Sequence, residues 1–127
     1  MQAFLYINLT AEEVYRQEVV EQVKQVLPSL AILDLDAGSD ELLQHYALRL
    51  LREAERTVVC IKADNSTDFL TSLMPLLEEL FQEGKQRLVL QVGHQPRLHR
   101  IFSARPHVAF TEVKCDEVVA EVKRFMQ

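Results

Sequence analysis

The residues with the clearest chemical potential form a polar loop, Asp64, Asn65 and Ser66, directly after a long apolar run. Their carboxylate, amide and hydroxyl groups could hydrogen-bond a polar ligand or coordinate a hard cation. The same residue types also tolerate tight turns and cap helices. Asn8 and Thr10 follow the first apolar run and offer the same choice, because the start of a helix can hold a phosphate or simply be capped. For both loops the turn-and-cap role is the simpler interpretation.

Metal and thiol chemistry has weaker support. Asp34 and Asp36 stand two apart on one strand face and could share a metal, but a solvated sheet edge explains both more simply. His94 and His99 are five apart, whereas two ligands on one helix face need a spacing of three or four. Cys115 begins a predicted helix, where the dipole favours a reactive thiolate, although an exposed thiol without a role is the simpler interpretation. We therefore predict no metal site and no cofactor.

The element that positions the Asp64 loop is a strand. Residues 57–63 are almost continuously apolar after Thr57, with Lys62 as the single interruption. A strand with one wet face alternates polar and apolar residues, whereas a strand buried on both faces need not alternate. The sequence therefore predicts a central buried strand, a polar loop and a helix that begins near Thr67. This is the repeating unit of a parallel α/β sheet.

The same unit recurs along the chain. Strands are predicted at residues 3–9, 30–36, 57–63, 87–93 and 107–113. Helices are predicted at about residues 10–26, 39–54, 67–83, 95–104 and 116–126. Thr10 and Glu13 have the spacing of a capping box for the first helix. The second helix is expected to turn these residues to the core: Leu43, Tyr46, Ala47, Leu50, Leu51 and Ala54.

Polarity orders the five predicted strands. The second and the fifth carry polar residues, while the first, third and fourth are mostly apolar. Edge strands tolerate polar residues better than central strands do. The order 2-1-3-4-5 places the polar strands at the edges and needs only right-handed crossovers. We therefore expect residues 1–127 to form a single flavodoxin-like α/β domain, a three-layer α/β/α sandwich with a five-stranded parallel sheet.

This topology also predicts where a ligand would bind. In such sheets, ligands lie beyond the carboxyl ends of the strands, at the switch point between strands one and three. The expected ligand-binding residues are Asn8, Thr10, Asp64, Asn65 and Ser66. His94 and Gln95 would flank them after strand four. The placement follows from topology and not from a motif, so it does not by itself assign a function.

Composition narrows the class of protein. The net charge of −5 makes a nucleic-acid binder unlikely. The two cysteines lack metal-ligand spacing, and Cys60 has the position of a small core residue, which suits a reducing compartment. The first apolar run has no basic segment before it and is too short to span a bilayer, so we expect a cytoplasmic protein without membrane contact. The dinucleotide, P-loop and GxSxG motifs are absent, which argues against flavin, nucleotide and acyl-transfer chemistry.

Lys114 and the following DEVVAEVKRF resemble the strand-end lysine and the final helix of response-regulator receiver domains, which share the predicted strand order. The resemblance covers about the last fifth of the chain. A receiver has an acidic pair for Mg²⁺ after strand one, where this chain has Asn8 and Thr10 around a leucine. Asp64 lies one or two residues late for a phospho-acceptor, and Gly93 replaces the strand-four hydroxyl. The resemblance thus implies receiver-like architecture without phosphorylation through Mg²⁺.

Two functional hypotheses follow. The favoured one is a non-enzymatic regulatory or protein-interaction domain that binds a protein partner or forms a homodimer. It is motivated by the absent phosphate loop and the absent acidic pair, and it would act through a helical or edge surface. The stretch from Lys85 to His107 contains five lysines and arginines and no acid, within an otherwise acidic chain. Such a stretch could meet an acidic partner or a phosphate, or it could be a solvated helix face. The alternative is a small enzyme or ligand-binding protein that uses the switch-point loops.

Overall fold

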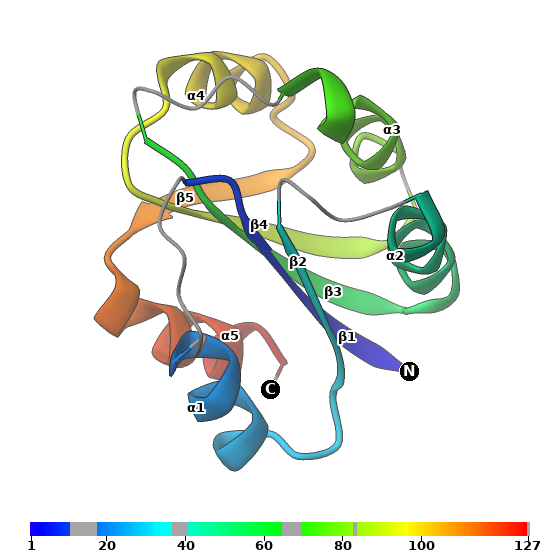
Figure 1. Cartoon of the computed structure of the whole chain (residues 1–127), viewed down its shortest axis with the longest axis vertical. Helices are drawn as coiled ribbons and strands as arrows, with labels where there is room; N and C mark the ends of the chain where they lie inside the picture. The colour runs from blue at the N-terminus through cyan, green and yellow to red at the C-terminus, as the bar shows by residue number, and fades with distance from the viewer. Residues whose placement is uncertain (11–17, 37–40, 65–69, 83, 127) are drawn as a thin grey trace.

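The computed structural model of the chain describes residues 1–10, 18–36, 41–64, 70–82 and 84–126 (Figure 1). The strands are β1 (Gln2–Asn8), β2 (Ala31–Asp36), β3 (Arg56–Lys62), β4 (Gln86–Val92) and β5 (Ala109–Val113). The helices are α1 (Glu18–Val26), α2 (Glu41–Glu53), α3 (Leu70–Leu80), α4 (Pro96–Ser103), the 3-10 turn η1 (Cys115–Glu117) and α5 (Val118–Met126). None of these helices is long and apolar enough to cross a membrane.

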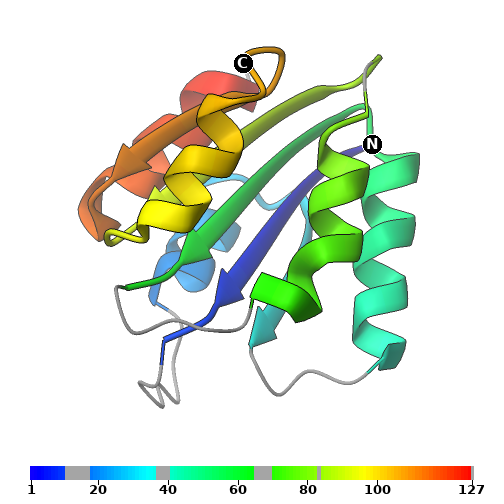
Figure 2. The same cartoon turned by 90° about the horizontal axis from the view of Figure 1, so that it is seen from above.

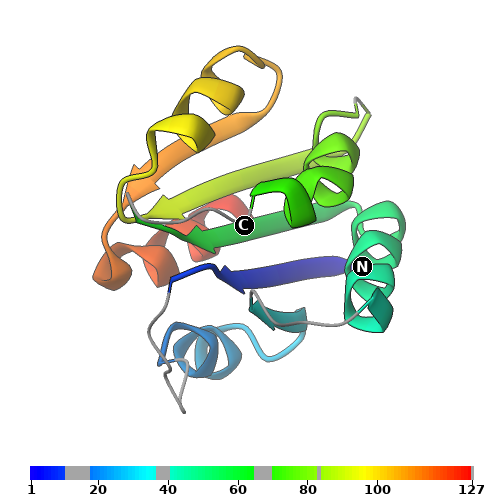
Figure 3. The same ribbon diagram turned by 45° about the horizontal axis from the view of Figure 1, so that its top comes forward.

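The five strands form one parallel sheet of order β2-β1-β3-β4-β5. Helices α1 and α5 cover one face of the sheet, and α2, α3 and α4 cover the other (Figures 1 and 2). The predicted flavodoxin-like three-layer sandwich, with its strand order, is therefore confirmed. The connection that follows β1 leads to one face and the connection that follows β3 leads to the other, so the switch point lies between these two strands (Figure 3).

The burial of the strands follows the order of the sheet. In β3, residues 57–61 are all buried, and in β4 residues 87–92 are all buried. In β5, by contrast, Ala109, Thr111 and Glu112 are exposed, and Asp34 of β2 is exposed as well. A central strand has a layer of helices on both faces, whereas an edge strand is only partly covered. The polar edge strands that the sequence predicted are confirmed.

Alternate residues of each strand build two separate cores. Val59, Ile61 and Val89 face α2, α3 and α4, where they join Leu51, Leu77 and Leu98. Phe4, Cys60 and Leu90 face α1 and α5, where they join Val23, Val118 and Val122. Each of these large apolar side chains stabilises the fold by about 1.5–3 kcal/mol when it is fully buried. Cys60 is fully buried, which confirms its predicted place in the core.

Tyr46 is the clearest error in the predicted core. We expected it on the buried face of α2, but 54% of it is exposed. The buried face is centred on Ala47 and Leu51, both of which are 0% exposed. Successive helix residues are about 100° apart, so Tyr46 lies beyond the edge of this narrow face. Its neighbour one turn earlier, Leu42, is 62% exposed, and the two form an apolar pair on the surface of α2.

Candidate functional site

The switch point brings the ends of β1 and β3 together. Asn8 and Lys62 are register partners, and the backbone N–H of Leu9 donates to the carbonyl of Lys62 at 2.8 Å. This bond continues the ladder one residue past the end of β1. The two loops that carry the predicted site therefore start side by side, as the topology required.

Asn8 uses its side chain to hold the first of these loops. It is 4% exposed, and its Oδ1 accepts hydrogen bonds from the backbone N–H of Thr10 at 3.0 Å and from the hydroxyl of Thr10 at 2.7 Å. An Asn that bonds to the backbone two residues later makes an Asx turn. The observed contacts therefore belong to the turn role of Asn8 and Thr10. The proposed capping partner, Glu13, lies outside the described residues.

Asp64 belongs to the second loop, which is bonded to the end of β4 and to the residue before α4. The residue before it, Ala63, donates its backbone N–H to the carbonyl of Val92 at 3.0 Å. The carbonyl of Asp64 accepts a hydrogen bond from Nε2 of Gln95 at 3.1 Å. Asn65 and Ser66, the other two predicted ligand-binding residues, lie outside the described residues. The structure thus places Asn8, Thr10 and Asp64 at the predicted edge of the sheet.

Gln95 links this edge to α4. It is 3% exposed, and its Oε1 accepts the backbone N–H of Arg97, so Gln95 is the N-cap of α4 while its Nε2 holds Asp64. From the sequence, Gln95 was expected only to flank the site. Pro96 at the first helical position was the available signal, because proline there follows a capping residue.

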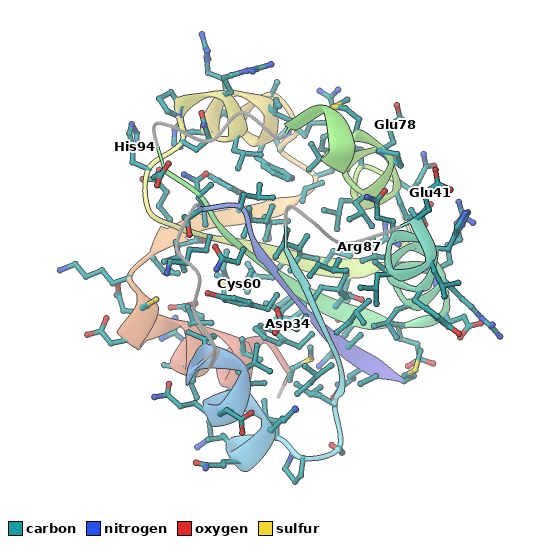
Figure 4. All side chains as sticks on the ribbon, in the orientation of Figure 1. Asp34, Glu41, Cys60, Glu78, Arg87 and His94 are labelled. Atoms are coloured by element: carbon teal, nitrogen blue, oxygen red, sulfur yellow. The ribbon has the colours of Figure 1, made fainter. Side chains whose placement is uncertain are left out.

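A second polar cluster, which the sequence did not reveal, lies at the carboxyl ends of β4 and β5. Gln91 is fully buried, and its Nε2 donates to the carbonyl of Gly93 and to Oε1 of Glu112, both at 3.2 Å. The same carboxylate oxygen lies 3.2 Å from Nδ1 of His94, at the edge of the sheet beside α4 (Figure 4). A carboxylate that bonds one imidazole nitrogen orients the ring and leaves Nε2 available for proton transfer. However, the His94 side chain is 63% exposed, so water weakens this contact.

Metal and thiol sites gain no geometric support. Within the described residues, no group of three or more His, Cys, Asp or Glu side chains could hold a metal ion. Burial raises the pKa of the Cys60 thiol well above its ordinary range, with a smaller electrostatic contribution from Cys115. The Cys60 thiol therefore stays protonated and unreactive in the folded protein. Cys115 is exposed.

No family model, curated protein or solved structure matches this chain.

Several basic residues of the stretch from Lys85 to His107 make contacts with other parts of the same molecule. Lys85 donates from Nζ to the carbonyl of Arg52 and, at 3.4 Å, to that of Ala54, both at the end of α2. Arg87 donates to the carbonyl of Leu51 at 2.9 Å and also to the carbonyl of Glu79 in α3. The last carbonyls of a helix have no partners within the helix and carry its negative end. These cations therefore hold α2 and α3 to the sheet.

The end of α3 is held by two further basic residues. Nε2 of His107 lies 2.8 Å from the carbonyl of Phe81, and the Arg105 guanidinium lies 4.3 Å from the centre of the Phe81 ring. The cation–π contact and the carbonyl contact together fix Phe81, which packs edge-on against Phe102 of α4. Four of the basic residues in this stretch, counting His107, thus serve the packing of helices.

The basic residues of α4 are exposed to solvent. Leu98 and Phe102 form the buried side of α4, at 0% and 2% exposure. Arg97, His99 and Arg100 are exposed, although the His99 ring also packs edge-on against Phe110 with 5.9 Å between ring centres, and α4 contains no acidic residue. Phe110 of β5 stacks on Phe102 at 4.9 Å, so α4 and β5 pack as one unit. We call the exposed face that Arg97, His99 and Arg100 form beside β5 the α4–β5 surface.

Proposed function

We propose that this protein is a non-enzymatic interaction domain that docks an acidic protein partner on its α4–β5 surface. The observation that carries the proposal is the exposure of Arg97, His99 and Arg100 on a helix without acidic residues, in a chain whose net charge is −5. A local field opposite in sign to that of the whole molecule steers and orients a complementary partner.

The support beneath α4 makes this surface suitable for recognition. Gln95 caps the helix and ties its start to the Asp64 loop, while Phe102 stacks on Phe110 of the neighbouring strand. A surface that is already ordered loses less conformational entropy when a partner binds. The exposed edge of β5 continues the same surface, because β5 is the last strand of the sheet and has a neighbour only on its β4 side.

The contacts at the switch point favour this proposal over the enzyme alternative. The side-chain oxygen of Asn8 accepts two hydrogen bonds from Thr10 within its own turn. The half-buried Asp64 keeps the alternative open, because it lies where a ligand of this fold would bind. The receiver-like architecture suggests a regulatory role. Because the acidic pair that would hold Mg²⁺ is missing, that role would depend on a protein partner and not on phosphorylation.

The test reverses charge on this surface and on a matched one. The double variant Arg97→Glu/Arg100→Glu changes the α4–β5 surface. The control Lys24→Glu/Lys123→Glu changes exposed residues of α1 and α5 on the opposite face of the sheet. Each double variant lowers the net charge by the same four units. Circular dichroism should show both folded like the parent domain.

The partner is first identified by affinity capture with quantitative mass spectrometry. Calorimetry with the purified partner then measures the dissociation constant of each variant. We expect the α4 variant to bind the partner at least about tenfold more weakly, and the control to bind as the parent does. Equal weakening in both variants would show that only net charge matters and would refute the proposal, as would recovery of nucleic acid in place of a protein. The alternative is an enzyme or ligand-binding protein that uses the switch-point loops. It would be the correct function if a small ligand raises the Tm of the parent but not of Asp64→Ala, and if both double variants still bind the partner.

A further inference from the structure

β5 forms an open edge of the sheet, because it pairs with β4 on one side and with no strand on the other (Figure 3). Backbone groups on the open side of an edge strand have no ladder partner. A strand of another molecule can add to such an edge, and then backbone hydrogen bonds supply affinity while alternate side chains supply specificity.

The outward-facing backbone groups of β5 belong to Phe110 and Glu112. The N–H and C=O groups of alternate strand residues point to opposite edges of a strand. In β4, the carbonyl of Val92 accepts the N–H of Ala63, so the backbone of Val92 faces β3 and that of its neighbour Gln91 faces β5. Gln91 is the register partner of Glu112, and in a parallel ladder it bonds the residues before and after its partner. The backbone of Glu112, and two residues earlier that of Phe110, therefore points away from the sheet.

The segments on either side of β5 use their own backbone groups, so the open ladder is limited to these two residues. Before β5, the N–H of Val108 donates to the carbonyl of Arg105 at 3.0 Å. After β5, the N–H of Lys114 donates to Oε1 of Glu117 at 2.9 Å, and the Lys114 carbonyl accepts the Glu117 N–H at 2.9 Å. Between them, the two outward residues have no backbone partner among the described residues, and they are exposed or half-buried. Their N–H and C=O groups are therefore available to an added strand.

β5 also lacks the features that commonly protect an edge strand, which are lysine, proline or a bulge. Its sequence AFTEV contains neither lysine nor proline, and each residue has a register partner in β4, so there is no bulge. Its single charged residue, Glu112, is held toward β4, because Nε2 of Gln91 donates to its Oε1 at 3.2 Å. The other edge strand, β2, carries the exposed Asp34 and also Asp36. Of the two edges, β5 is therefore the one that an acidic strand can approach.

The surroundings of this edge specify the strand that fits it. On one face α4 lies beside β5, where the His99 ring packs on Phe110 and Arg100 is exposed next to it (Figure 2). On the other face α5 packs mainly against α1 and β3, and Ala109 and Thr111 of β5 are exposed. Successive side chains of a strand point to opposite faces. A strand that alternates acidic residues with valine or threonine therefore places carboxylates beside α4 and β-branched side chains beside Thr111.

We infer that the acidic partner contributes such a segment, which binds as an additional strand on the open edge of β5. This inference rests on the proposed docking function and names the part of the partner that docks. The segment bonds the N–H and C=O groups of Phe110 and Glu112, while its acidic side chains lie beside His99 and Arg100. Lys114, exposed at the end of β5, adds a further basic residue next to the added strand.

The test is a titration of the ¹⁵N-labelled protein with a short capped peptide in which valine and glutamate alternate. We expect hydrogen exchange of the Phe110 and Glu112 amides to slow about tenfold or more at saturation, whereas the Thr111 amide, which already faces β4, should change little. Arg100→Glu should weaken peptide binding about fivefold or more, and Lys123→Glu, an exposed charge reversal on α5, should leave it unchanged. Peptides with N-methylated backbones separate strand addition from attraction between side chains. The fully methylated peptide should bind about tenfold more weakly or worse, while methylation of alternate residues should leave one edge of the peptide able to bind.

Several results would overturn the inference. They are a lack of saturable binding at millimolar peptide, unchanged exchange of the two amides at saturation, and equal binding of the fully methylated and unmethylated peptides. Equal protection by a peptide with lysine in place of glutamate would also overturn it, because charge would then not select the strand. Slower exchange of these amides at higher protein concentration, without peptide, would assign the edge to a second copy instead. The natural partner's response to Arg97→Glu/Arg100→Glu tests the docking function separately, so that function can hold where strand addition fails.

Discussion

Of the two glycines that the structure describes, Gly93 is the one at which an added methyl group should do more damage. It follows β4 with φ of +91°, a conformation that residues with a side chain rarely adopt. A Cβ at this position would lie 2.1 Å from the carbonyl oxygen of Ala63. That carbonyl belongs to backbone that is itself bonded to Val92, through the N–H of Ala63 at 3.0 Å. Gly93→Ala therefore forces the ends of β3 and β4 apart.

The cost has two parts, and a second glycine separates them. Placing alanine at positive φ costs about 1–2 kcal/mol. Moving packed backbone to relieve a clash costs a further 1–3 kcal/mol or so. Gly84 has φ of +99°, and no atom of the described residues lies within 4 Å of the point that a Cβ would occupy, so Gly84→Ala incurs only the first cost. We expect a loss of about 2–5 kcal/mol for Gly93→Ala and about 1–2 kcal/mol for Gly84→Ala.

Urea unfolding followed by far-UV circular dichroism measures both values on the same scale. For a chain of this length, each 1 kcal/mol corresponds to roughly 4 °C in Tm, so the two variants should also separate clearly on heating. The two curves must have the same dependence on urea for the comparison to hold. If Gly93→Ala and Gly84→Ala lose the same stability, the close approach of Gly93 to Ala63 is wrong.

Two further predictions concern the core. Burial raises the pKa of the Cys60 thiol in the folded protein, so this thiol ionises at lower pH in the unfolded chain. Relative to Cys60→Ala, the free energy of unfolding should not depend on this thiol below about pH 8.5. Above that pH it should fall by about 1.4 kcal/mol per pH unit. Unfolding titrations of the two proteins at pH 8 and pH 10 measure the difference, and parallel pH profiles would contradict it. On α2, Leu51→Ala should cost about 2–5 kcal/mol, while Leu42→Ala, at 62% exposure, should change stability by less than about 0.5 kcal/mol. Similar losses in urea unfolding would place Leu42 in the core after all.

The fold was predictable because its signals are local and repeated. Each buried strand of a parallel sheet is a short apolar run, and each is followed by a helical pattern of about a dozen residues. The strand order came from polarity alone: Asp34 in β2 and Glu112 in β5 are exposed, as expected of edges. Tyr46 was misplaced because periodicity gives the direction of a helix face and not its width.

The candidate sites were less predictable because their contacts join distant positions. Gln91 and Glu112 are 21 residues apart, and Gln95 reaches back 31 residues to the carbonyl of Asp64. Neither pair has a sequence motif, since an amide can bond to any carbonyl or carboxylate that the fold brings near. Topology placed Asn8 and Asp64 at the correct edge of the sheet, but it could not show that the Asn8 side chain holds its own turn.

The basic stretch shows why the charge of a segment is not the charge of a surface. Lys85, Arg87 and His107 stand in one acid-free run with the arginines of α4, and sequence alone gives them equal weight. In the fold they meet carbonyls at the ends of α2 and α3, where a cation offsets the negative end of a helix. Within this stretch, the proposed docking therefore depends on the exposed arginines of α4. Reversal of those charges should remove binding without loss of stability, whereas reversal at Arg87 should unfold the domain, because it would bury a carboxylate beside Glu79.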